Sequence, residues 1–141
     1  MTSFDVSKIG AAVEQLDWAI RIFLDYKAYI PSITLAGAAE EVIGQGVKDR
    51  ATSIILKDKY AAELGIPKKV VSDDYLNKAK NWLKHWDGRA SNDVISLELD
   101  EEALQYIVRA LANLVTYDQS QPSEGPRFWK WMSENRPDLL S

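Results

Sequence analysis

Residues 31–44 read PSITLAGAAEEVIG, and this stretch decides the fold. Before Glu40 it carries no charge on any face, which predicts a helix buried among other elements. The proline suits the first turn of such a helix, and the glycines at positions 44 and 46 are expected to end it. The AGAA run at 36–39 is small enough for a neighbouring helix to pack very close. A helix buried in this way needs other helices around it, so the sequence predicts an all-α fold.

The segment before this helix predicts a first helix that Ser7 caps and that runs to about Tyr29. It has two apolar lines, about 140° apart around the helix axis. A helix that is apolar on two sides is either central or part of a subunit interface, and both interpretations stay open. The second gives a homodimer that forms through Trp18 and Ile22. The first line is Ile9, Ala12, Val13, Leu16, Ala19, Ile20 and Phe23, and the second is Ala11, Trp18, Ile22 and Tyr29.

Further helices are expected after the buried one. One covers 47–64 and stops at Gly65, and the next begins at Ser72 or Asp73 and runs to about Trp86. A long helix opens with the acids at 100–102, and the FWKWM segment forms a short last helix that Pro137 ends. Their expected buried residues are Val47, Ala51, Ile54, Ile55 and Leu64, then Tyr75, Ala79, Trp82, Leu83 and Trp86, then Ala103, Leu104, Ile107, Leu111, Leu114 and Val115.

The alternating stretch at 94–99 is a short strand, an extended linker or a segment that pairs with another chain. The economical architecture is therefore a four- to five-helix antiparallel bundle that forms one domain over 1–141.

Composition excludes several classes of function. The chain has 141 residues, no cysteine, one histidine and a net charge of −4. Disulfides, thiolate zinc sites and cysteine nucleophiles are impossible, and general DNA binding is not expected. No signal peptide, membrane span, phosphate loop, nucleophile elbow or dinucleotide fingerprint occurs, so a cytoplasmic protein without a cofactor and without a membrane partner is expected.

The densest group of polar residues is KAKNWLKHWDGR at 78–89. Asn81 and His85 are four residues apart and share a helix face. Lys80 and His85 are five apart, about 140° around a helix, so they act together only if the helix ends near His85 or a second subunit supplies one of them. His85 is either a general acid or base, because histidine titrates near neutrality, or a hydrogen-bonded and inert residue at the core border.

Glu40 and Glu41 form the second candidate site. Glu40 is expected on the buried side of its helix, where a carboxylate needs a partner, and Lys80, Asn81 and His85 are candidates. The pair serves as an active-site acid, as a metal site with His85 and Asp87, or as an internal tether between helices. A di-metal bundle uses repeated Glu-x-x-His pairs, which are absent here, so no metal is expected.

The C-terminal aromatic residues with Arg127, Lys130 and Arg136 suggest either a base-stacking strip or a helix that caps the bundle. The capping helix is the simpler interpretation.

The segment from Lys80 to His85, KNWLKH, resembles the signature of the HEPN superfamily: arginine, a polar residue that is often asparagine, about three further residues, then histidine. The resemblance implies an all-helical domain that commonly dimerises. Many members are metal-independent ribonucleases, and others bind nucleotides or RNA without cleaving them. The LAGAAEE segment at 35–41 is also similar to small bacterial proteins to which no function is assigned.

In the ribonuclease form of this resemblance, Asn81 orients the site and His85 handles the 2′-OH proton or the leaving group. Lys80 or Arg89 holds the phosphate, with Lys84 nearby. Lys80 stands where the family has arginine, and lysine lacks the planar fork that grips phosphate, which argues against catalysis. Two alternatives stay beside this hypothesis: a non-enzymatic homodimerising interaction module, and a bundle that binds a small molecule or metal through Glu40, Glu41 and His85.

Overall fold

The computed structural model describes residues 1–89 and 93–140, and over these residues the chain is helical with no β-strand. The all-α prediction is confirmed. The single-domain assignment stays a prediction. The elements are α1 (Lys8–Arg21), η1 (Ile22–Tyr26), α2 (Tyr29–Val47), η2 (Lys48–Arg50), α3 (Thr52–Leu64), α4 (Lys68–Val70), η3 (Val71–Leu76), α5 (Lys78–Lys84), α6 (Leu99–Asp118), α7 (Gly125–Asn135) and η5 (Pro137–Leu139).

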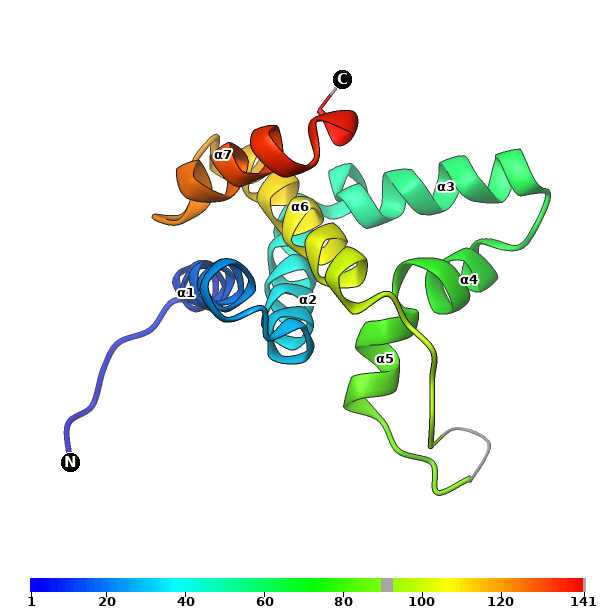
Figure 1. Ribbon diagram of the computed structural model, residues 1–141, viewed down its shortest axis with the longest axis horizontal. Coiled ribbons are helices and arrows are strands. Elements are labelled where there is room, and N and C mark those ends of the chain that lie inside the picture. Colours follow the sequence, from blue (N-terminus) through cyan, green and yellow to red (C-terminus); the bar gives the residue numbers. More distant parts are fainter. Residues whose placement is uncertain (90–92, 141) are drawn as a thin grey trace.

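Helix α2 lies at the centre, with α1 and α6 packed along it (Figure 1). Its buried apolar side chains join those of α1, α6 and α7 in one core, as the uncharged stretch predicts. The helix is not buried on every side, because Ala38 and Glu41 are exposed. The close approach predicted at 36–39 is confirmed at Gly37, where an added Cβ would lie 2.9 Å from Cδ of Lys80.

The first helix is shorter than expected. Ser7 caps α1 as predicted, since its Oγ accepts from the Gly10 N–H at 2.9 Å. The α-helix then ends at Arg21, and one wide turn, η1, leads to Lys27 with φ of 52° in the left-handed region. Tyr29 therefore starts α2 instead of ending the first helix, and the proline at 31 lies inside α2.

The expected end of α2 at two glycines is also wrong, because the helix continues to Val47. Gly44 is a packing residue, since a Cβ there would lie 3.3 Å from Nδ2 of Asn113. Helix α3 accordingly begins at Thr52 and not at Val47. The predicted stop is confirmed at Gly65, with φ of 67° and its N–H bonded to the Ala61 carbonyl at 3.0 Å.

Helix α3 buries none of its own residues, so the expected core positions Ile54, Ile55 and Leu64 are wrong, whereas Val47 and Ala51 before it are buried. Together α3, α4, η3 and α5 form an arm, residues 52–84, to one side of the central helices (Figure 1). The arm contacts the core mainly where α5 meets α2 and α3 meets α6.

A single helix over 72–86 is wrong, because the chain turns helical directly after Pro67 and breaks at Asn77. In an unbroken helix the Lys80 N–H would bond the Leu76 carbonyl. Here the Lys80 N–H donates to the Tyr106 hydroxyl at 3.2 Å, and the Leu76 carbonyl accepts from Nη1 of Arg109 at 3.0 Å. Two side chains of α6 thus satisfy both backbone groups and set where α5 starts.

This break changes which side chains reach the core. Ala79 is buried and Leu83 packs against the core, as expected. Tyr75 and Trp86 are exposed, so their assignment to the core is wrong.

The remaining predictions hold with one exception. Residues 94–98 have no strand partner among the described residues and serve as the linker into α6. The buried line of α6 is confirmed except for Val115, which is exposed. Helix α7 caps the core: Phe128 is buried, and the Trp131 ring lies 5.1 Å from that of Phe23. In the described part of the chain no helix combines the length and the apolar character needed to cross a membrane.

Candidate functional site

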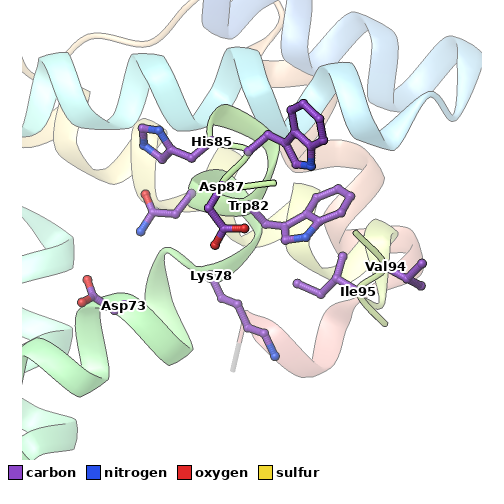
Figure 2. Close-up of a pocket in the computed structure, with 9 residues that line it drawn as sticks. Asp73, Lys78, Trp82, His85, Asp87, Val94 and Ile95 are labelled. Atoms are coloured by element: carbon purple, nitrogen blue, oxygen red, sulfur yellow. The ribbon is translucent and has the colours of Figure 1, made fainter. Parts of the chain in front are cut away.

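A pocket of about 470 Å³ opens along α5 and the segment that follows it (Figure 2). Asn81 and His85 both line it, as their four-residue spacing predicts. Trp82 and Trp86 line the same pocket, and Lys78 supplies its cation. In the view of Figure 2, the Trp82 ring lies on the side of Ile95, and His85 lies on the opposite side.

The local backbone brings Asn81 and His85 to this pocket. Helix α5 ends at Lys84, and His85 takes an extended conformation with φ of −127° and ψ of 139°. Its N–H still donates to the Asn81 carbonyl at 3.1 Å, which closes the last helical turn. The imidazole is exposed, so the prediction of a histidine at the core border is wrong.

Two indole rings give the pocket its apolar surface. Trp86 is 81% exposed, and its indole Nε1 donates to Oδ1 of Asp93 at 3.0 Å. Trp82 is half-buried. An exposed indole face fixed by a hydrogen bond at its edge is a suitable platform for stacking.

Lys80 does not join this pocket. It is 8% exposed, its stem lies against Gly37, and its Nζ lies 3.5 Å from Oε2 of Glu41 on α2. The helix does end next to His85, yet the ammonium and the imidazole line different cavities. The cation and the histidine of the KNWLKH segment are therefore not brought together within one chain.

The two cations proposed for phosphate, Lys84 and Arg89, do not line this pocket, although Arg89 pairs with the lining residue Asp87. Nη2 of Arg89 lies 2.7 Å from Oδ2 of Asp87, and the backbone N–H of Arg89 donates to the same carboxylate. Nζ of Lys84 lies 3.7 Å from Oε2 of Glu41. Lys78 belongs to the polar segment at 78–89 but was not predicted as a site residue, although it lies one helical turn before Asn81 and Trp82.

Glu40 is an internal tether, which was one of its predicted roles, but the expected partners are wrong. Its Oε2 lies 3.1 Å from Nη2 of Arg109, and the two side chains are 3% and 5% exposed. The Arg109 guanidinium also stacks on the Tyr106 ring, 4.5 Å from its centroid. A sequence signal existed: Tyr106, Arg109 and Asn113 follow three-and-four spacing along the buried side of α6.

Burial raises the pKa of the Tyr106 hydroxyl on α6, although the hydrogen bond from the Lys80 N–H acts in the opposite direction. The hydroxyl thus stays protonated and neutral at physiological pH.

The metal alternative gains no support. Over residues 1–89 and 93–140, no three His, Asp or Glu side chains come together as a group that could hold a metal ion. The Glu40 carboxylate faces a guanidinium and the Glu41 carboxylate faces two ammonium groups, in place of the expected His85.

The second apolar line of the first helix does not lie in the centre of the fold. Trp18 is 47% exposed, and the Arg21 guanidinium covers its ring at 4.4 Å. Ile22 is half-buried in η1, and Tyr29 belongs to α2. The alternative interpretation, a homodimer interface, stays a prediction.

Comparison of the chain with models of protein families, with curated proteins and with solved structures finds no match. The relationship to the HEPN superfamily therefore stays a prediction that rests on the KNWLKH resemblance.

Proposed function

We propose that this protein is a HEPN-like helical domain that binds RNA or a nucleotide in the α5 pocket, as a cytoplasmic binding module and not a nuclease. The observation that carries the proposal is the meeting of Asn81, His85, Trp82, Trp86 and Lys78 in one open pocket. Each of these side chains has a use in recognising an unpaired nucleotide.

The lining offers groups that can bind a base and one cation for its phosphate. Two carboxylates also line the pocket, Asp73 and Asp87, and Asp87 is paired with Arg89. Indole faces stack bases of any sequence, each worth about 1–3 kcal/mol. The Asn81 amide offers a donor and an acceptor for the edge of a base, and the His85 imidazole adds a further polar group. Lys78 can pair with a phosphate oxygen as a point charge.

The distribution of charge favours a polyanion on this side of the molecule. Residues 48–89 contain ten Lys or Arg against six Asp or Glu, a net charge of +4. The rest of the chain contains seven against fifteen, a net charge of −8. The field of such an uneven molecule steers an anionic ligand toward residues 48–89 and away from the acidic remainder.

Binding is favoured over cleavage because the cation of the KNWLKH segment is turned away. Lys80 faces Glu41 and lines a separate hollow, so no cation from the resembling motif stands beside the imidazole. The cation that lines the pocket with His85 is Lys78, which lies outside the KNWLKH segment.

The first test is a titration of single-stranded RNA into the wild type and into Trp86→Ala, followed by fluorescence anisotropy of a labelled oligonucleotide. Loss of one stacking platform is expected to weaken binding by roughly tenfold. Trp18→Ala is the matched control, because that exposed indole lies on α1 and not in the pocket. Equal affinity of all three proteins, or no binding, overturns the proposal.

A second experiment separates binding from cleavage. Wild type and His85→Ala, shown to fold alike, are incubated with a mixed RNA pool without added metal. No cleavage by either protein is expected from a binding module. Cleavage by the wild type alone would make His85 catalytic and would replace the binding module with a ribonuclease.

The exposure of Trp18 favours a second candidate, a homodimerising interaction module. Burial of this indole against a second copy predicts a dimer in sedimentation that Trp18→Glu converts to a monomer. A monomeric wild type at all concentrations would remove this candidate.

A further inference from the structure

A second polar hollow, of about 410 Å³, lies on the other side of α5 from the Trp82 pocket, between α2, the start of α3 and α5 itself. It is a distinct cavity, because its lining shares no residue with that pocket. Two of its lining residues are lysines, and five are acidic or polar: Glu40, Glu41, Gln45, Ser53 and Asn77. The residues that matter here are Glu41, Gln45, Lys48, Ser53, Asn77 and Lys80.

Lys80 is the unusual member of this lining. A lysine that is 92% buried carries a desolvation cost that a close counter-charge normally offsets. The carboxylate of Glu41 is the only ion partner of Lys80 over residues 1–89 and 93–140, at 3.5 Å, whereas charge-assisted bonds are usually about 2.7–2.9 Å. Glu41 is itself 46% exposed and is shared with Lys84. The ammonium group is therefore only partly compensated.

The charges around the hollow leave an excess of positive charge. The Glu40 carboxylate on its floor is already neutralised by Arg109. Glu41 pairs with the ammonium groups of Lys80 and Lys84, and Lys48 is a further cation of the lining.

The backbone adds to this electrostatic environment. Helix α3 begins at Thr52, whose N–H donates to Oδ1 of Asn113 at 2.8 Å, and Ser53 of its first turn lines the hollow. The N-terminal end of α3, which is the positive end of the helix dipole, therefore borders the hollow. Asn77 lines the hollow as well, and its Oδ1 is buried without a hydrogen-bond partner in the described part of the chain.

We propose that this hollow is a binding site for a phosphate group, as carried by a phosphomonoester, held by Lys80, Lys48 and Ser53. The Glu41 carboxylate occupies the place of the anion in the free protein and moves outward when the phosphate binds. This site is independent of the nucleotide pocket, since neither the buried lysine nor its counter-ion takes part in that pocket.

Calorimetric titration with inorganic phosphate tests the proposal on the full chain at low ionic strength. Lys48→Ala is expected to weaken binding by roughly tenfold, because a charge-assisted hydrogen bond is lost. Glu41→Gln is expected to tighten binding by roughly three- to tenfold, because it removes the competing carboxylate and keeps the side-chain shape. Lys48 is exposed, so its removal leaves the fold intact.

Two controls make the result specific. Lys130→Ala removes an exposed lysine of α7 and is expected to leave phosphate binding unchanged. Trp86→Ala is also expected to leave it unchanged, so failure of the nucleotide pocket and failure of this site are told apart. No phosphate binding in Glu41→Gln, or equal binding in Lys48→Ala and Lys130→Ala, overturns the proposal.

Discussion

Removal of the Glu40 charge is expected to destabilise the fold strongly, because it leaves the Arg109 guanidinium buried without a counter-ion. Breaking a buried pair from one side costs about 3–5 kcal/mol. Glu40→Gln keeps the shape and an oxygen that can still accept from Nη2, so we expect about 2–3 kcal/mol for that change. Glu40→Ala also loses the hydrogen bond and leaves a void, and is expected to reach the upper end of about 5 kcal/mol.

Replacement of both partners gives the sharper test. Arg109→Met alone strands a buried carboxylate and removes the donor to the Leu76 carbonyl, so it is expected to cost more than Glu40→Gln. In the double variant Glu40→Gln with Arg109→Met neither position of the pair carries a charge. Its cost is expected to fall to about 1–3 kcal/mol, the cost of the unpaired Leu76 carbonyl. The two changes are therefore coupled by about 2 kcal/mol or more.

Urea denaturation followed by tryptophan fluorescence measures these differences, provided that the dependence on urea has the same slope in all variants. Asp58→Asn is the matched control. It breaks the exposed pair with Lys68, 3.0 Å apart, and is expected to change stability by less than about 0.5 kcal/mol. Single changes at Glu40 and Arg109 that cost no more than this control, or that simply add in the double variant, would refute the reasoning.

Three other perturbations have defined outcomes. Gly37→Ala is expected to lower the free energy of unfolding in urea, because its Cβ would meet the Lys80 stem at 2.9 Å. In a Lys80→Ala background, where only helix propensity acts, the same change is expected to raise the free energy of unfolding by about 1 kcal/mol. Tyr106→Phe removes the acceptor of the Lys80 N–H at 3.2 Å and is expected to cost about 1–3 kcal/mol in the same assay; an unchanged midpoint would contradict this. Burial raises the pKa of Glu102 above 4.5, so the folded state binds more protons than the unfolded state and stability falls as pH rises through that range. Glu102→Gln is therefore expected to melt above the wild type at about pH 7 and to lose this advantage at about pH 4.

Structural features that are specified by residues close together in the chain could be predicted from the sequence. The uncharged run before Glu40 identifies the central helix, Ser7 caps the first helix, and Gly65 stops the third. The residues that specify each of these features are neighbours in sequence, so each feature can be recognised without knowledge of distant contacts.

Features that depend on distant partners could not be predicted. The apolar stripe from Tyr75 to Trp86 indicates one helix, but the break at Asn77 is stabilised by side chains of α6 that come about thirty residues later. The counter-ion of Glu40 is equally distant, at Arg109. At the site, the spacing of Asn81 and His85 correctly predicts a shared pocket. The Lys80 side chain points toward α2 instead, because its stem fits into the space that the missing side chain of Gly37 leaves open.

The Leu76 carbonyl and the Lys80 N–H bond to side chains of α6 instead of to each other, and this affects the order of folding during synthesis. The start of helix α5 is stabilised by the Tyr106 hydroxyl and the Arg109 guanidinium of α6. Residues 78–84 can therefore reach their final structure only after this later segment has left the ribosome. The first two helices can pair as soon as they emerge, but the α5 pocket is completed near the end of translation. A chain interrupted before residue 109 would carry every residue of that pocket and still lack the contacts that assemble it.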